Sequence, residues 1–299
     1  MTKRISALLL FSLLLMLSTA CHQDRKQEVQ QLLSAMRKAY EAADYSGVRL
    51  LADSLHNHYA TDTVARREAL TLSREAECKE AERNMQYADS MLRIVSARID
   101  SLAPSFKKNT PTESGEFEYF LAGFGPAPTE ERTRLRCGAD TLGQLHVLSV
   151  YVGSKSILHT ALRLSDAQTK SSIQTADVPF DGALNYRFAD LGLNYELVTY
   201  PQEETAKLAD FFMQADSEGH ALRAELLSKG KVVHSFPISR ADVKALSSTA
   251  RIRQLFDSHQ TFRHERAKAQ KRITYLKRSS MHLFVRDSFI FPIHSSPIS

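Results

Sequence analysis

Apolar residues recur at steps of three and four between Asp24 and Leu102, which is the spacing of amphipathic helices. The first stripe of this kind consists of Val29, Leu32, Leu33, Met36 and Tyr40. Ser46 can cap a second helix, in which Val48, Leu51 and Leu55 occupy the apolar positions. The pattern therefore opens with two helices joined by the short segment that ends at Tyr45.

A longer helix is predicted next, because residues 62–103 contain neither Gly nor Pro. Its apolar seam consists of Met85, Ala88, Leu92, Val95, Ile99 and Leu102. This is coiled-coil spacing over less than three heptads, so we expect the seam to pack within the chain rather than to dimerise. The helix ends at Ala103–Pro104, because the residue before a proline disfavours helix. The first two helices resemble a single tetratricopeptide hairpin without the further copies that a solenoid needs, and residues 21–104 are predicted to form one helical module.

Strand-like patterns follow a polar linker at residues 107–115. Alternating or β-branched segments predict strands at 116–121, 132–137, 144–152 and 157–164, with weaker strands near Ile173, near Tyr186 and at 195–199. We expect residues 153–156 to form a hairpin loop, 205–214 a short helix, and 221–227 with 232–236 a closing hairpin. These elements predict a mainly antiparallel, sandwich-like β domain over residues 115–238.

Helical spacing returns after Ser239, which can cap a helix with Asp242 near its start. The predicted helix covers residues 239–280, and residues 281–299 form an apolar tail that fits neither a helix stripe nor a strand pair. The segment 263–278 is strongly basic. It is interpreted either as a solvated helical face or as a contact for anionic lipid head groups. The fold class predicted for the whole chain is α+β.

The first 21 residues have the features of an export signal. Lys3 and Arg4 precede an apolar run over residues 7–17, which is too short to span a membrane as a helix. The small residues 18–20 then lead to Cys21, and this arrangement resembles the lipobox of bacterial lipoproteins. Ser18 stands where lipoboxes usually carry Leu, and a plain secretory signal is the alternative.

The lipobox resemblance implies removal of a signal peptide over residues 1–20 and acylation of Cys21, palmitate being a typical acyl group. Each buried methylene contributes about 0.8 kcal/mol, so several acyl chains anchor a protein firmly. His22 rather than Asp follows the cysteine. By analogy with lipoprotein sorting, we expect the chain on an outer membrane, facing the periplasm or the cell surface, with the membrane as its partner through Cys21.

Composition narrows the possible partners. The net charge of +5 falls to +3 without Lys3 and Arg4, which is too mild to indicate nucleic acid. Charged residues at 24% and hydrophobic residues at 43% are typical of a globular protein. Besides Cys21, the chain contains Cys78 and Cys137. An exported compartment would permit a disulfide between them, but they lie in different predicted modules, and two separate buried thiols are the alternative.

Candidate chemistry is sparse. The sequence contains no Gly-rich phosphate loop, no His-Glu-x-x-His, no Gly-x-Ser-x-Gly and no EF-hand loop. His159 lies near Ser156, Thr160 and Asp166, the residue types of a hydrolase triad. Neighbouring side chains of a strand point to opposite faces, which argues against this triad.

Other polar and aromatic residues give weaker signals. His56 and His58 are two positions apart on a helix and do not share a face. The remaining histidines are scattered: His220, His234, His259, His264 and His294. We therefore expect no catalytic residue, no metal site and no cofactor. The tyrosines of the β region are expected in strands or in the core, with one or two able to line a ligand groove: Tyr119, Tyr151, Tyr186, Tyr195 and Tyr200.

The order of these pieces is similar to that in a family of uncharacterised lipoproteins of Bacteroidales bacteria. Besides the signal and Cys21, the shared motifs are Ala42-Ala43-Asp44-Tyr45, Arg66-Arg67-Glu68-Ala69, Ser149-Val150-Tyr151-Val152-Gly153, Ile157-Leu158-His159-Thr160 and Ala267-x-x-x-Lys271-Arg272-Ile273-x-Tyr275. The resemblance covers most of residues 1–280, and the tail departs from it. The family has no assigned activity, so the resemblance implies the architecture and the anchor and transfers no catalytic residue.

Three functions remain open from the sequence. The first is a non-enzymatic, lipid-anchored envelope protein with a structural role or a protein partner. The second is a glycan- or peptide-binding module in the β domain, which a deep groove with exposed Tyr or Phe would favour and a filled sandwich would oppose. The third is a hydrolase, which would require a nucleophile within hydrogen-bond reach of His159.

Overall fold

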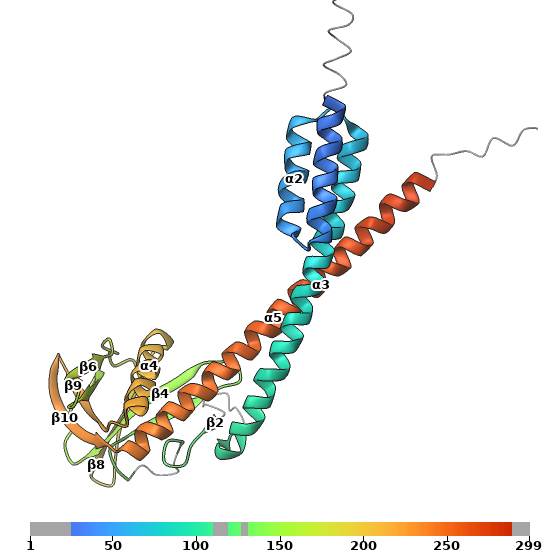
Figure 1. The fold of residues 1–299 in the computed structure, drawn as a ribbon. Coiled ribbons are helices and arrows are strands. Elements are labelled where there is room, and N and C mark those ends of the chain that lie inside the picture. The colour runs from blue at the N-terminus through green and yellow to red at the C-terminus, as the bar shows by residue number, and fades with distance from the viewer. Residues whose placement is uncertain (1–24, 110–118, 127–130, 289–299) are drawn as a thin grey trace, which may run out of the picture. The chain divides into compact units, whose positions relative to one another are not determined.

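The computed structural model describes residues 25–109, 119–126 and 131–288. The chain is α+β, as predicted, with helices at the N-terminal end, two antiparallel sheets in the middle and a long C-terminal helix (Figure 1). Its described residues divide into two compact units, one containing residues 25–89 and 265–288 and the other containing the described residues between 90 and 264. The two long helices, α3 (Thr63–Leu102) and α5 (Arg240–Ser288), each contribute to both units, which the predicted division into 21–104, 115–238 and 239–280 did not anticipate.

The first unit contains the helix over residues 25–41, helix α2 (Tyr45–His58) and the beginning of α3. Asp44 rather than Ser46 caps α2, because its carboxylate accepts a hydrogen bond of 2.9 Å from the Gly47 amide. The predicted stripes supply five buried residues of this unit's core, and α3 adds three alanines that were not predicted: Val29, Leu33, Met36, Val48 and Leu55, with Ala65, Ala69 and Ala76. Burial of one face of each helix explains the three-and-four spacing.

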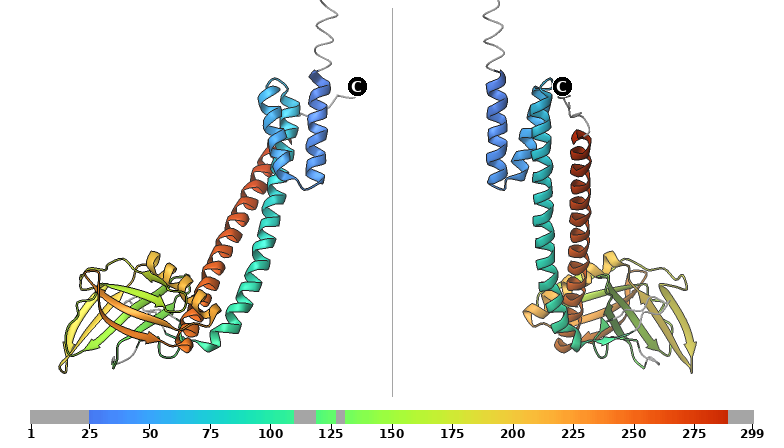
Figure 2. Two further views of the ribbon diagram at one scale, coloured as in Figure 1. Left: turned by 60° about the vertical axis from the view of Figure 1, so that its left-hand side comes forward. Right: turned by 90° about the vertical axis from the view of Figure 1, so that its right-hand side faces the viewer.

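The C-terminal part of α5 lies beside α3 within the same unit (Figure 2). Ala269, Ile273 and Leu276 are buried there. Ion pairs join the two helices: Arg266 with Asp89 at 2.6 Å, Lys277 with Glu82 at 3.1 Å, and Arg272 with Glu77. Part of the basic segment 263–278 is therefore paired with carboxylates of the chain itself.

Helix α5 is longer than predicted. Ser239 and Asp242 cap it reciprocally, with Asp242 N donating to Ser239 Oγ and Ser239 N donating to Asp242 Oδ2, both at 3.2 Å. The helix continues to Ser288, so residues 281–288 belong to it and not to a separate tail. The sequence pattern ended too early because the apolar residues of this segment do not form a helix stripe. The rest of the predicted tail lies outside the described residues.

The second unit is built on two antiparallel sheets. The six-stranded sheet has the order β1 (Lys107–Lys108), β2 (Tyr119–Phe120), β3 (Arg134–Ala139), β4 (Leu145–Gly153), β8 (Leu193–Thr199), β7 (Asn185–Asp190). The four-stranded sheet has the order β10 (Lys231–Ile238), β9 (Leu222–Ser228), β5 (Ala161–Asp166), β6 (Ser171–Gln174). A short 3-10 helix over Ala103–Ser105 ends α3 at the predicted proline.

One core fills the space between these elements. It includes Val147 and Val198 from the larger sheet, Leu164 and Leu226 from the smaller sheet, and Phe212 from helix α4 (Gln202–Glu218). The beginning of α5 also contributes to it. Buried side chains of both sheets thus pack against one another, as in a sandwich.

The connection after β4 differs from the prediction. β4 pairs with β3 and β8, whereas β5 pairs with β6 and β9, so the segments 144–152 and 157–164 do not form a hairpin. Residues 154–160 instead cross from one sheet to the other. The closing hairpin is confirmed, with β9 and β10 joined by Lys229 (φ 50°) and Gly230 (φ 75°), a turn that matches the twist of the strands.

Candidate functional site

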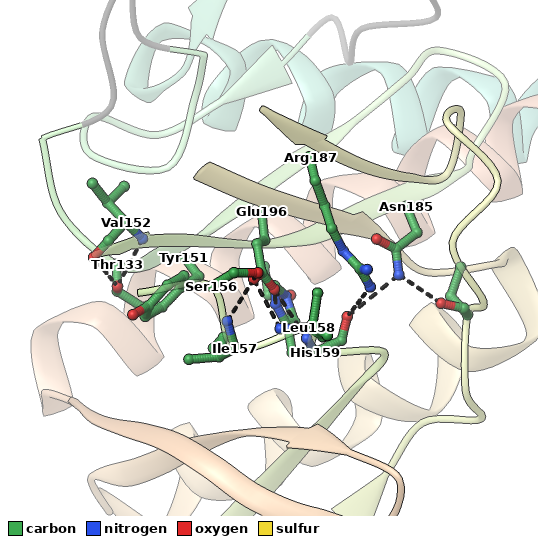
Figure 3. Close-up of polar contacts among 12 residues, drawn as sticks. Thr133, Tyr151, Val152, Ser156, Ile157, Leu158, His159, Asn185, Arg187 and Glu196 are labelled. Atoms are coloured by element: carbon green, nitrogen blue, oxygen red, sulfur yellow. Dashed lines mark hydrogen bonds and ion pairs between the residues drawn. The ribbon is translucent and has the colours of Figure 1, made fainter. Parts of the chain in front are cut away.

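The carboxylate of Glu196, on β8, is the centre of the most extensive buried polar cluster that we describe (Figure 3). Its Oε1 accepts hydrogen bonds from Ser156 Oγ and the Ile157 amide at 2.7 Å and from the Leu158 amide at 2.8 Å. Its Oε2 accepts from the amide of His159 at 2.9 Å and from Nδ1 of the same residue at 2.8 Å. Five donors from one loop thus meet one charged group.

The backbone of the crossing loop explains this convergence. Leu158 has a φ of 53°, a left-handed conformation that costs a non-glycine residue about 1–2 kcal/mol. The turn directs three successive amides toward the carboxylate, an arrangement that makes a concave anion site. Hydrogen bonds to a charged group are roughly twice as strong as neutral ones, which offsets the backbone strain.

A chain of hydrogen bonds continues from His159 into the core. Its Nε2 lies 2.9 Å from Ser149 Oγ, which lies 2.7 Å from the hydroxyl of Tyr200. Because Nδ1 must donate to the Glu196 carboxylate, a neutral ring accepts at Nε2 from the Ser149 hydroxyl. That hydroxyl oxygen is then free to accept from Tyr200. We call Glu196, His159, Ser149 and Tyr200 the buried relay.

Burial and hydrogen bonding shift the pKa values of Glu196 and Tyr200 in opposite directions. Burial raises the pKa of Glu196, but hydrogen bonds from His159, Ser156 and the loop amides outweigh it and lower that pKa to about 2. Burial raises the pKa of Tyr200, and the hydrogen bond to Ser149 reduces this effect. Glu196 is therefore ionised at neutral pH, and Tyr200 is not.

The buried relay has the hydrogen-bond order of a Ser-His-acid triad, although it is not the predicted one. Of the predicted members, Ser156 contacts Glu196 rather than His159, the Thr160 hydroxyl donates to Asp177, and Asp166 pairs with His220. The hydrolase hypothesis required a nucleophile within reach of His159, and Ser149 meets that requirement in distance.

Access distinguishes the relay from an active site. The side chains of Ser149 and His159 have no exposed surface, and the exposed fractions of Glu196 and Tyr200 are 1% and 2%. A substrate carbonyl must approach within about 3 Å of a nucleophile to react. In this arrangement the relay joins the crossing loop to both β4 and β8, which is a structural task.

The sequence carries one signal for this relay, in the phase of its strand residues. Along 144–152 the apolar phase contains Leu145, Val147 and Tyr151, and Ser149 occupies the same phase. Glu196 shares the inward phase of β8 with Val198. A polar residue on an apolar phase needs a buried partner. His159 was expected in a strand, but it lies in the crossing loop, which is why its partners could not be deduced from alternation.

The second candidate feature is the outer face of the β7–β8 hairpin. Tyr186 and Phe188 are two residues apart on β7 and remain 47% and 41% exposed. The Phe188 ring stacks on the Tyr195 ring at a centroid distance of 4.6 Å and an interplanar angle of 2°. We call the exposed apolar residues of this hairpin the aromatic edge: Leu184, Tyr186, Phe188, Leu191 and Leu193.

β7 is the last strand of its sheet and pairs with β8. Thr199 N donates to Leu184 O at 2.7 Å, so the register directs the backbone groups of Asn185, Arg187 and Ala189 away from β8. Those of Asn185 are already bonded to the Asp181 carboxylate and the Gly182 amide. The backbone N–H and C=O of Arg187 and Ala189 therefore face the open side of the strand.

The turn of this hairpin is unusual. Leu191 (φ 47°) and Gly192 (φ 80°) form a tight turn with two left-handed residues, a type that favours Asn-Gly. Leu191 is 93% exposed, so neither burial nor local propensity accounts for a leucine there. Strained residues that the core does not require point to an interaction.

Other candidate tyrosines, cysteines and histidines of the sequence analysis pack against other parts of the protein or contact other side chains. Tyr151, Tyr195 and Tyr200 are buried, and Tyr119 packs on Phe256 at a ring distance of 4.9 Å. Both cysteines in the described part of the chain are free, Cys78 in the first unit and Cys137 in the second. His56 contacts Arg66.

The predicted anchor at Cys21 lies outside the described residues. Within the described part of the chain, no helix has the length and apolar character needed to cross a membrane. Comparison of the chain with protein-family models, curated proteins and solved structures finds no match. The resemblance to Bacteroidales lipoproteins thus stays a prediction from the motifs.

Proposed function

We propose that this chain is a lipid-anchored, non-enzymatic protein of the cell envelope that holds another protein through its β domain. The lipobox-like segment ending at Cys21 supports the anchor. The observation that carries the binding role is the aromatic edge, which combines exposed apolar side chains with backbone groups of an edge strand that have no partner among the described residues. The partner contributes an extended segment that adds to β7.

Edge addition fits both parts of this surface. Main-chain hydrogen bonds to an edge strand supply affinity, and alternate side chains supply specificity. The backbone of Arg187 and Ala189 offers two donors and two acceptors to such a segment. Tyr186 and Phe188 point to one face of the sheet, so every second partner residue meets an aromatic ring. Covering one large exposed apolar side chain contributes about 1.5–3 kcal/mol.

Exposed edge strands promote aggregation unless they are protected. β7 has only six residues, and the Asp181 turn occupies the backbone of the first of them. The edge is thus long enough for a short partner strand and too short to extend a sheet freely. This limit favours a defined partner over self-association.

Photo-crosslinking tests the proposal in intact cells. A benzoylphenylalanine at position 186 is expected to give one defined protein adduct, whereas the same group at Tyr275, which is 62% exposed on α5, is not. Ala189→Pro removes an outward-facing N–H without removing a bond to β8 and is expected to abolish the adduct, while Ala189→Ser keeps it. An adduct that survives Ala189→Pro would refute edge addition, and transfer of label to glycan alone would support the glycan-binding alternative.

A further inference from the structure

Three ligand-type atoms converge at one end of the smaller sheet. Nδ1 of His220 lies 2.7 Å from Oδ2 of Asp166 and 3.2 Å from Oε2 of Glu218. All three atoms lie within 4.8 Å of one another. Asp166 is the last residue of β5, Glu218 is the last residue of α4, and His220 follows shortly before β9.

The end of α4 creates this proximity. Gly219 adopts a φ of 70°, and the amides of Gly219 and His220 bond back to the carbonyls of Asp216 and Ala215. This left-handed cap reverses the chain within one residue. The side chains of Glu218 and His220 therefore meet although they are only two positions apart.

The outer atoms of both carboxylates are already held. Oδ1 of Asp166 accepts from the amides of Gln168 at 2.8 Å and Thr169 at 3.4 Å. Oε1 of Glu218 accepts from Nε2 of Gln214 at 3.1 Å. The remaining oxygen of each group faces His220. Such outer hydrogen bonds orient the ligands in protein metal sites.

The local charge is unbalanced without a cation. The carbonyl end of a helix carries partial negative charge, which disfavours nearby carboxylates. Glu218 stands at that end of α4, and the last turn contains no basic residue. Among the described residues, the ion-pair partner of both Asp166 and Glu218 is His220, and neither carboxylate pairs with Lys or Arg. Asp166 is 4% exposed, so little of its own surface contacts water.

We propose that Asp166, Glu218 and His220 bind one divalent metal ion of the zinc class. Zinc takes carboxylate oxygen and imidazole nitrogen at about 2.0–2.2 Å in a tetrahedron, which puts ligand atoms about 3.4 Å apart. Small movements bring the three atoms to these separations. Coordination through Nδ1 requires the tautomer of His220 that carries its ring proton on Nε2. The side chain of Glu218 is 35% exposed, so a water molecule can supply the fourth ligand.

Calorimetric titration with Zn²⁺ tests the site on the full chain, purified in detergent without a histidine tag and treated with chelator. We expect a single equivalent to bind, and the visible spectrum of Co²⁺ to show tetrahedral coordination. Glu218→Gln and His220→Gln are expected to weaken Zn²⁺ binding at least about tenfold. Glu203→Gln and His58→Gln change exposed residues of the same types and serve as matched controls.

Asp166→Asn is a poor test, because this buried group also accepts two amides and its loss can disturb the fold. Circular dichroism verifies that the Glu218 and His220 variants are folded. Substoichiometric binding by the wild-type chain would overturn the proposal. Equal binding by the wild-type chain and both site variants would also overturn it, because the Zn²⁺ would then occupy other groups.

Discussion

Replacement of Glu196 by Gln tests the buried relay most directly. Gln keeps the shape of the side chain but removes its charge and presents an N–H to a loop that offers only donors there. The hydrogen-bond donors around Glu196 are Ser156, His159 and two further amides. We therefore expect the variant to lose both the charge-assisted bonds and the fit of the loop.

The pKa of Glu196 sets the magnitude. It falls from 4.5 to about 2 in the folded protein, because the hydrogen bonds outweigh the burial that raises it. One pKa unit corresponds to about 1.4 kcal/mol, so ionisation of Glu196 contributes about 3 kcal/mol to the stability of the second unit. A lowered carboxyl pKa stabilises the folded state above the unfolded pKa. This contribution is complete above about pH 5 and is lost as the pH falls toward 2.

Hydrogen exchange of the β4 and β8 amides measures this effect, because it reports on the second unit even if the two units unfold separately. At pH 7, Glu196→Gln is expected to lower the free energy of unfolding by about 3–5 kcal/mol. The difference from wild type should shrink below about pH 5. Glu203→Gln, at an exposed position of α4, is the matched control. Parallel pH profiles of wild type and Glu196→Gln would refute the reasoning.

Three further predictions concern other residues. Ser149 should resist fluorophosphonate labelling in the folded protein because it is fully buried, and labelling that disappears in Ser149→Ala would instead support the hydrolase hypothesis. Cys21→Ala should abolish acyl labelling and membrane retention, and unchanged labelling would show that another residue is acylated. Leu191→Asn should raise the free energy of unfolding by about 1 kcal/mol, because Asn tolerates the left-handed turn, and should weaken the crosslink at position 186. Thermal unfolding measures the stability of Leu191→Asn, and a variant less stable than wild type would contradict this prediction.

Elements with a strong local period could be predicted from the sequence. The stripe that includes Leu33 and Met36 became a helix core, and the turn at Lys229 and Gly230 closed the expected hairpin. In these segments one period or one turn type decides the structure. The end of α5 was predicted too early, because the apolar residues of 281–288 do not follow a helix stripe in the sequence.

The relay could not be predicted, because its members come from strands that are distant in sequence. The position of Ser149 on an apolar phase shows that it needs a buried partner. Which partner it finds depends on the pairing of β4 with β8 and on the crossing loop, and both are decided by tertiary packing. Local alternation suggested a hairpin there, and that wrong strand assignment placed His159 incorrectly.

The inward and outward faces of the β7–β8 hairpin connect the relay to the proposed binding surface. Inward, Glu196 ties the hairpin to the crossing loop, and Asn185 Nδ2 donates to the carbonyls of His159 at 3.3 Å and Val178 at 2.7 Å. Outward, the same strands present Tyr186 and Phe188. A strand that is fixed before binding loses less conformational entropy when a partner pairs with it. Glu196→Gln should therefore weaken partner capture, although Glu196 does not contact the partner. This effect should become smaller at low temperature or with a stabilising osmolyte. The effect of Ala189→Pro on partner capture should stay the same under both conditions.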